Sequence, residues 1–176
     1  MKREELRRRT KCLTVSALLT ALGVVLLAVG ALLDVVDLSV AAVASLFCVY
    51  AVIEMGKGYP WMIWGVTAGL AWLLLPQKSP ALFYLLIGCY PIFKELFEKL
   101  RTVVSWLLKI LYFHAALGLV WLGFRFLLAP GVAAPKLWYL ILLYVAALFC
   151  FILYDVLMTR LITFYLLRLH DRLGIK

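Results

Sequence analysis

Residues 12–33 read CLTVSALLTALGVVLLAVGALL and contain no charged side chain. A helix rises about 1.5 Å per residue, so roughly 20 apolar residues cross the hydrocarbon core of a bilayer, which is about 30 Å thick. Similar stretches recur to the end of the 176-residue chain, in which 66% of the residues are hydrophobic and 15% are charged. A soluble domain of this size could not cover so much apolar surface with polar groups. The chain is therefore expected to be an all-α, polytopic membrane protein.

Six transmembrane spans are predicted, separated by the Asp, Gly and Pro residues that are typical of turns. They cover residues 12–33, 39–55, 59–75, 81–93, 103–128 and 137–158. The second to fourth spans are short, so one of them could be tilted or broken, and a five-span arrangement stays open. Pro91 lies where the fourth span passes into a charged segment, and a proline kinks or ends a helix. In residues 93–100 the apolar and charged side chains fall on opposite faces, which predicts an amphipathic cytoplasmic helix with Lys94 on its charged face.

The distribution of basic residues predicts the orientation. With the N-terminus inside, all but three of the 18 Lys and Arg residues lie in cytoplasmic segments, and the three are Lys78, Arg125 and Lys136. Cytoplasmic loops carry such an excess, so both termini are expected in the cytoplasm, with the protein in the cell membrane. The net charge of +9 then needs no nucleic acid to explain it, because basic residues beside the spans attract anionic lipid head groups. One transmembrane domain, 1–176, is expected, with a basic cytoplasmic segment, 1–11, retained as an anchor and a basic helical tail, 159–176.

The chain offers few of the residues that carry enzyme chemistry. It has two histidines, and it lacks zinc-protease, phosphate-loop and serine-nucleophile motifs. The four cysteines each lie in or beside an apolar span without CxxC spacing, so they are expected to be small buried residues and not ligands or disulfides. We therefore expect no enzyme activity, no cofactor and no metal.

Charged residues inside the spans are costly and need a partner or a function. Four charged residues lie far enough inside a span to need a partner: Glu54, Lys109, Arg125 and Asp155. Lys109 and Asp155 fall at similar depth near the cytoplasmic side of the fifth and sixth spans, so an ion pair between them is expected. A structural role, or snorkelling to the interface, is the alternative to a role in transport.

A stripe of polar and aromatic residues on the fifth span resembles the lining of a cavity open to the outside. His114, Gly118, Trp121 and Arg125 share one helical face. Trp72 is a further candidate for stacking on a ligand. The alternative is that Arg125 snorkels to outer head groups beside an interfacial tryptophan. Asp34, in the acidic loop after the first span, could line a substrate entrance, whereas Asp37 is expected to cap the next helix.

Small residues on the first span predict close helix packing, in this chain or with a partner. Ala17 and Ala21 form an AxxxA pattern, and Gly23, Ala28, Gly30 and Ala31 follow it. In lipid, helices associate by close packing, which small residues permit.

With these features the chain resembles the substrate-binding S components of the energy-coupling factor (ECF) transporters. The resemblance rests on the size, six spans with both ends inside, the AxxxA pattern, and the acidic outer loop. It also rests on the segment LDVVDLSVAAVASLFCVYAVIEMGKGYPWMIWGVTAGLAWLLLP (33–76), which is similar to spans two and three of that family. Two further segments, GCYPIFK (88–94) and YDVLMTRLITFYLLRL (154–169), are instead similar to other bacterial membrane proteins that look S-component-like, so a close relative of the S components is the alternative.

The resemblance implies a transport protein that binds a small molecule on the outer side. Ala17 and Ala21 would dock on a transmembrane coupling subunit driven by two ATPases. The substrate pocket would be formed by the first outer loop and spans four to six. The alternatives are a cell-envelope scaffold without a substrate, and a lipid-handling protein, either a flippase or a lipid-modifying enzyme.

Overall fold

The computed structural model describes residues 2–33, 36–56, 58–123 and 136–169. Nearly all of these residues are helical, and no strand occurs among them. The all-α class is therefore confirmed. The predicted ligand residues Asp34 and Arg125 lie outside the described residues.

The helices follow the predicted spans closely. In chain order they are α1 (Lys2–Leu33), α2 (Asp37–Glu54), α3 (Gly58–Leu74), α4 (Ser79–Ile87), α5 (Tyr90–Phe97), α6 (Thr102–Gly123) and α7 (Leu137–Phe164), followed by the π-helical turn η2 (Tyr165–Leu169). α1 includes the basic N-terminal segment, so the helix starts well before the apolar run does. Within the described residues, five helical segments are long and apolar enough to cross a membrane: α1, α2, α4 with α5, α6, and α7 with the following turn. These segments fit a multi-pass membrane protein.

α3 is the shortest of the predicted spans that form one helix. Its 17 residues extend about 25 Å, somewhat less than the hydrocarbon core. Its sequence is as apolar as that of its neighbours, so length is what distinguishes it from the five longer segments.

The fourth predicted span consists of two helices, α4 and α5. A break in one of the short spans was among the predicted possibilities. The backbone N–H of Gly88 donates to the carbonyl of Tyr84 at 2.7 Å, and α5 begins two residues later with Pro91 in its first turn. A proline is tolerated there because the first N–H groups of a helix have no intrahelical acceptor. A side chain at Gly88 would come within 3.0 Å of the Tyr84 ring, so glycine fits this tight connection.

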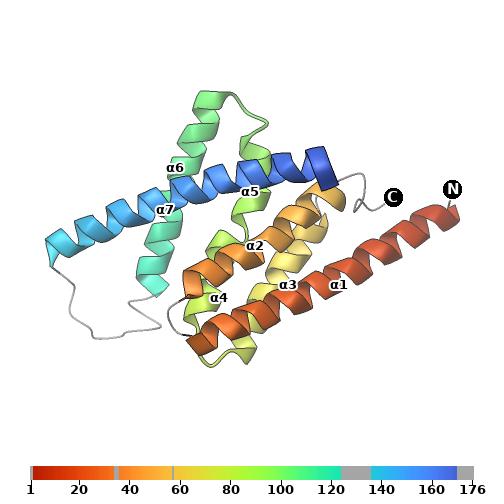
Figure 1. Ribbon diagram of the computed structural model, residues 1–176, viewed down its shortest axis with the longest axis horizontal. Coiled ribbons are helices and arrows are strands. Elements are labelled where there is room, and N and C mark those ends of the chain that lie inside the picture. The colour runs from red at the N-terminus through yellow and green to blue at the C-terminus, as the bar shows by residue number, and fades with distance from the viewer. Residues whose placement is uncertain (1, 34–35, 57, 124–135, 170–176) are drawn as a thin grey trace. The chain divides into compact units, whose positions relative to one another are not determined.

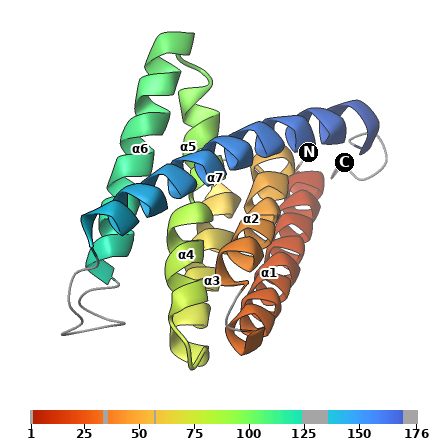
Figure 2. The same cartoon turned by 60° about the vertical axis from the view of Figure 1, so that its left-hand side comes forward.

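The chain divides into two compact units, and the division falls inside α6, between Lys109 and Ile110. In the first unit, α1 packs against α2 and α3, α2 packs against α3, α4 and α5, and α3 packs against α4. α1 and α2 run side by side in both views (Figures 1 and 2). The core of this unit is formed mainly by small and aliphatic residues around a fully buried tyrosine, among them Leu27, Ala44, Cys48, Ile63 and Tyr84.

The second unit, described by itself, contains the C-terminal part of α6 and α7. An aromatic cluster joins the two helices, with Phe113 centred 5.2 Å from Phe151 and 6.0 Å from Tyr144. Most of the α7 side chains are exposed, and most of these are apolar, as is typical of a surface in contact with lipid.

Candidate functional site

The small residues of α1 lie on two different faces of the helix. Gly23, Gly30 and Ala31 are buried inside the first unit, whereas Ala17 and Ala21 are exposed. A Cβ atom at Gly23 would lie 3.0 Å from Thr67 Cγ2, and one at Gly30 would lie 3.1 Å from Val40 Cγ1. The glycines therefore let α1 approach α3 and α2 within the chain.

The exposed alanines form a separate apolar surface, which we call the AxxxA face: Ala17 and Ala21, with the exposed neighbours Leu18 and Leu22. Two alanines one turn apart between leucines leave a shallow depression on the helix, into which another helix can pack. None of these four residues lies in the core of the first unit.

In α6, His114 is engaged by hydrogen bonds at both ring nitrogens. Its Nδ1 is 2.8 Å from the carbonyl oxygen of Ile110, and its Nε2 is 3.0 Å from the Tyr144 hydroxyl. A carbonyl can only accept, so Nδ1 carries the proton, and in the neutral ring the Tyr144 hydroxyl donates to Nε2. A ligand that bound His114 would have to take the place of Tyr144. Sequence reasoning missed Tyr144 because the register between α6 and α7 cannot be read from either helix alone.

The other predicted ligand residues are exposed or partly buried. Trp121 is exposed on α6, and Trp72 is half-buried on α3. Trp72 lies in the first unit and His114 and Trp121 lie in the second, so their joint role in one pocket stays a prediction. Lys78 donates from Nζ to the carbonyl oxygens of Trp72 and Leu75, both at 2.6 Å, and so satisfies carbonyls at the C-terminal end of α3.

Asp37 does not cap α2 as predicted. Val36 occupies the cap position, and no side chain makes the capping hydrogen bond. Asp37 is instead the first residue of the helix, and its Oδ1 is buried without a hydrogen-bond partner in the described part of the chain. A carboxylate in the first turn is still favourable, because the N-terminal end of a helix carries a partial positive charge.

Glu54, Lys109 and Asp155 are all buried, as expected for charges within apolar spans. Lys109 Nζ lies 3.8 Å from Glu98 Oε1 and 5.4 Å from the centre of the Trp106 ring. Its ammonium group is thus stabilised by a carboxylate and an aromatic face. The pairing of Lys109 with Asp155 stays a prediction.

Lys94 corrects the prediction of a solvated amphipathic helix in this segment. Its side chain is 1% exposed, and its Nζ lies 3.1 Å from Glu98 Oε1, one turn further along the chain. Leu96 and Leu100, predicted to face the membrane or a partner, are exposed. Glu98 therefore bridges Lys94 and Lys109. The spacing of the charged residues predicted that Lys94 lies on the polar face of the helix. Instead, Lys94 is buried together with Tyr90, Pro91 and Ile92 at the start of α5.

Three of the four cysteines are buried, and all four are free thiols. Cys150, on α7, is exposed, so the expectation of burial is wrong for this residue. Because residues 137–154 of α7 contain no charged side chain, Cys150 still lies in an apolar stretch. No group of His, Cys, Asp and Glu suited to a metal ion occurs among the described residues.

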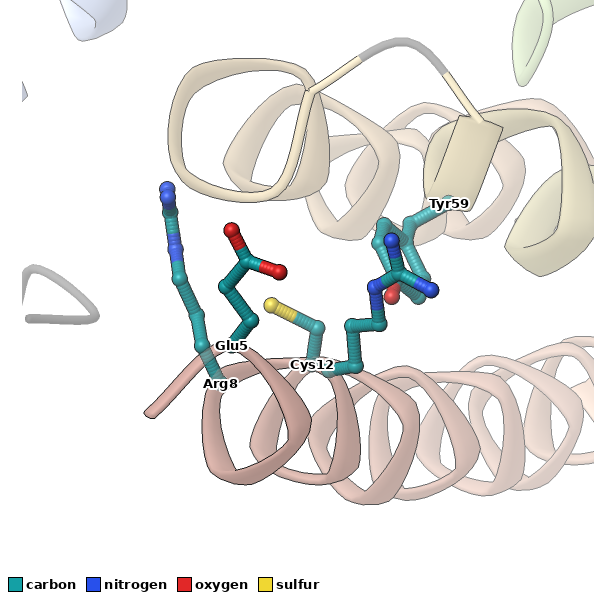
Figure 3. Close-up of a pocket in the computed structure, with 5 residues that line it drawn as sticks. Glu5, Arg8, Cys12 and Tyr59 are labelled. Atoms are coloured by element: carbon teal, nitrogen blue, oxygen red, sulfur yellow. The ribbon is translucent and has the colours of Figure 1, made fainter. Parts of the chain in front are cut away.

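The described part of the first unit contains at least two cavities. The larger, of about 280 Å³, lies between α1 and the start of α3 and is lined by Glu5, Arg8, Arg9, Cys12 and Tyr59 (Figure 3). The smaller, of about 60 Å³, lies between α3 and α5 and is lined by Pro60, Trp61, Ile92, Glu95 and Leu96. Neither lining contains His114, Trp72 or Trp121. Comparison with protein-family models, curated proteins and solved structures finds no match to this chain.

Proposed function

We propose that this chain is an integral membrane transport protein of the S-component type. In this proposal it crosses the cell membrane six times with both termini in the cytoplasm. It binds a small molecule on the outer side and docks through α1 on a membrane partner that supplies the energy. The chain itself performs no chemistry on the substrate.

The observation that carries the proposal is the AxxxA face of α1. The glycines of α1 are used inside the chain, whereas Ala17 and Ala21 are exposed. In a bilayer an exposed helix gains little from alanine over leucine, because lipid tails are as apolar as either side chain. Two exposed alanines at this spacing favour close contact with a helix of another chain.

The ligand site of the proposal lies toward the outer ends of the spans. Its candidate residues are those predicted from the sequence: Asp34, Trp72, His114, Trp121 and Arg125. An arginine suits a carboxylate or phosphate because its planar donors match two oxygens at once, and a tryptophan provides a flat apolar wall. Asp37, whose buried Oδ1 has no hydrogen-bond partner in the described part of the chain, adds an acceptor at the outer end of α2.

Purification from native membranes in mild detergent, followed by mass spectrometry of the bound proteins, tests the proposal. A transport subunit of this type is expected to recover a larger membrane protein together with two ATPases. Recovery of cell-wall or division proteins instead would support a scaffold and contradict transport. Turnover of a lipid by the purified chain alone would contradict the absence of chemistry.

A further inference from the structure

The larger cavity combines charges of both signs at one end of α1. Arg8 and Arg9 contribute two guanidinium groups, Glu5 contributes a carboxylate, and Tyr59 contributes a hydroxyl from the start of α3. Figure 3 shows the side chains of Glu5 and Cys12 extending from α1 into the space on whose far side Tyr59 lies. The lining thus carries one net positive charge and also one acceptor for a cation.

The position of this cavity along α1 corresponds to the head-group layer of a bilayer. Cys12 opens the uncharged run of residues 12–33, and Glu5 lies about two turns before it, within the charged segment. The distance from Glu5 to Cys12 along the helix is about 10 Å, enough to extend across one interfacial layer of about 5–8 Å. Cys12 is buried and therefore forms an apolar floor, whereas Glu5, Arg8 and Arg9 are exposed.

A phosphate alone does not match this lining, because the Glu5 carboxylate would repel it. A simple cation does not match it either, because two guanidinium groups stand beside the carboxylate. A phosphodiester that also carries a primary ammonium group satisfies both: arginine forks bind phosphate oxygens, and a carboxylate accepts hydrogen bonds from an ammonium group. The cavity volume, about 280 Å³, is near the lower end for small-molecule pockets, as suits a head group whose acyl chains stay in the membrane.

We propose that this cavity binds the head group of phosphatidylethanolamine from the membrane leaflet at the N-terminal end of α1. Arg8 and Arg9 supply the guanidinium groups that bind the phosphate, and Glu5 binds the ammonium group. The bound lipid then bridges α1 and α3 where both helices meet the interface. This site lies outside the proposed transport function, since none of its residues belongs to the AxxxA face or to the predicted ligand site.

Native mass spectrometry of the full-length protein in detergent tests the site by counting bound lipids. The probes are phosphatidylethanolamine, phosphatidylglycerol and phosphatidylcholine with identical acyl chains. The wild-type protein is expected to prefer phosphatidylethanolamine over both, because only this head group joins a phosphate to a hydrogen-bonding ammonium group. An equal or stronger preference for phosphatidylglycerol would show that only net positive charge matters and would overturn the proposal.

The chain offers a matched control for each charge. Arg8→Gln with Arg9→Gln is expected to weaken phosphatidylethanolamine binding about tenfold. The control, Arg3→Gln with Arg7→Gln, removes the same charge outside the lining and is expected to change phosphatidylethanolamine binding by less than about twofold. Glu5→Gln is expected to abolish the preference for phosphatidylethanolamine over phosphatidylglycerol, and Glu4→Gln to preserve it. Equal effects of a variant and its control would contradict a defined site.

A last comparison separates a lipid from a soluble ligand. Water-soluble phosphoethanolamine carries the same phosphate and ammonium groups without acyl chains. It is expected to displace the bound lipid only at a large excess, because the acyl chains hold the lipid head group at the interface. Displacement at equal concentration would show that the site takes a free phosphate ester, and the membrane lipid would then be the wrong occupant.

Discussion

Glu98 links two buried lysines, Lys94 on α5 and Lys109 on α6. Its Oε1 lies 3.1 Å from Lys94 Nζ and 3.8 Å from Lys109 Nζ. A buried ammonium group is costly unless it is paired, so this carboxylate stabilises two charges that the apolar surroundings disfavour. The sequence placed Lys109 inside an apolar span and predicted that it needs a partner, with snorkelling to the interface as the alternative. It did not predict burial for Lys94, because neighbouring charges made that segment look solvated.

We predict that Lys94→Met destabilises the protein and that Lys99→Met does not. Both lysines pair with a glutamate one turn before or after them, but the side chain of Lys94 is 1% exposed and that of Lys99 is 54% exposed. After loss of the buried partner, Glu98 is 45% exposed and keeps Lys109, so water screens the remaining carboxylate and the expected cost is about 1 kcal/mol. An exposed pair one turn apart, such as Lys99 with Glu95, contributes about 0.3–0.5 kcal/mol.

Thermal unfolding in detergent, followed by circular dichroism, measures this difference. Lys94→Arg provides a further comparison, since it keeps the charge and is expected to recover part of the stability. Equal unfolding temperatures for Lys94→Met and Lys99→Met would refute a stabilising role for the buried pair.

At the scale of the helix, α1 shows why a pattern of small residues is ambiguous. Gly23 and Gly30 pack inside the chain, and Ala17 and Ala21 are exposed, although all four belong to one run of small residues. The predicted close packing is confirmed for Gly23 and Gly30, whereas packing at Ala17 and Ala21 stays a prediction. It did not separate the two faces, since that depends on the rotation of α1 relative to α2 and α3.

We predict that Gly23→Leu disrupts the first unit and that Gly69→Leu is tolerated. A Cβ at Gly23 already comes within 3.0 Å of Thr67, whereas one at Gly69 on α3 meets no atom within 4 Å. Overpacking a close contact costs about 1–3 kcal/mol. An open helical glycine replaced by a better helix former is instead expected to stabilise by up to about 1 kcal/mol.

Denaturation in mixed micelles gives the free energy of unfolding for both variants. The free energy of unfolding is expected to fall clearly for Gly23→Leu and to rise slightly or stay unchanged for Gly69→Leu. A Gly23→Leu variant as stable as the wild type would mean that α1 and α3 do not pack closely at this point.

At the scale of the whole molecule, the sequence predicted the helical segments and their order. Long apolar runs bounded by proline, glycine and charged residues are expected to be helical, because backbone groups in lipid must be hydrogen-bonded within a helix. Pro91 indicated a kink or helix end in this region, and the structure places the break just before it, between Ile87 and Tyr90. The candidate ligand site was harder to predict, because its members lie on separate helices whose relative rotation no local pattern encodes.

The number of crossings depends on α3, and cysteine labelling from outside the cell decides it. If α3 crosses the membrane, a cysteine at Gln77 is outside and one at Lys99 is inside. If α3 does not cross, the two positions exchange sides. We predict that a membrane-impermeant maleimide labels Gln77→Cys and not Lys99→Cys, in a protein whose four native cysteines are replaced by alanine. The reverse pattern would contradict six crossings with the N-terminus in the cytoplasm.

The central claim is that α1 docks through its AxxxA face on a membrane partner, and recovery of that partner tests it most directly. Ala17→Leu with Ala21→Leu fills the depression on this exposed face and leaves the core of the first unit unchanged. The control is Ala115→Leu with Ala146→Leu, which makes the same change at exposed positions of α6 and α7.

Each variant is purified from native membranes in mild detergent, and the co-purified proteins are quantified by mass spectrometry relative to the wild type. We expect the amount of partner that co-purifies with the AxxxA variant to fall about tenfold or more, while the yield and unfolding temperature of the variant stay unchanged. The control variant is expected to recover the partner as the wild type does. Partner recovery equal to that of the wild type in the AxxxA variant would contradict docking through α1.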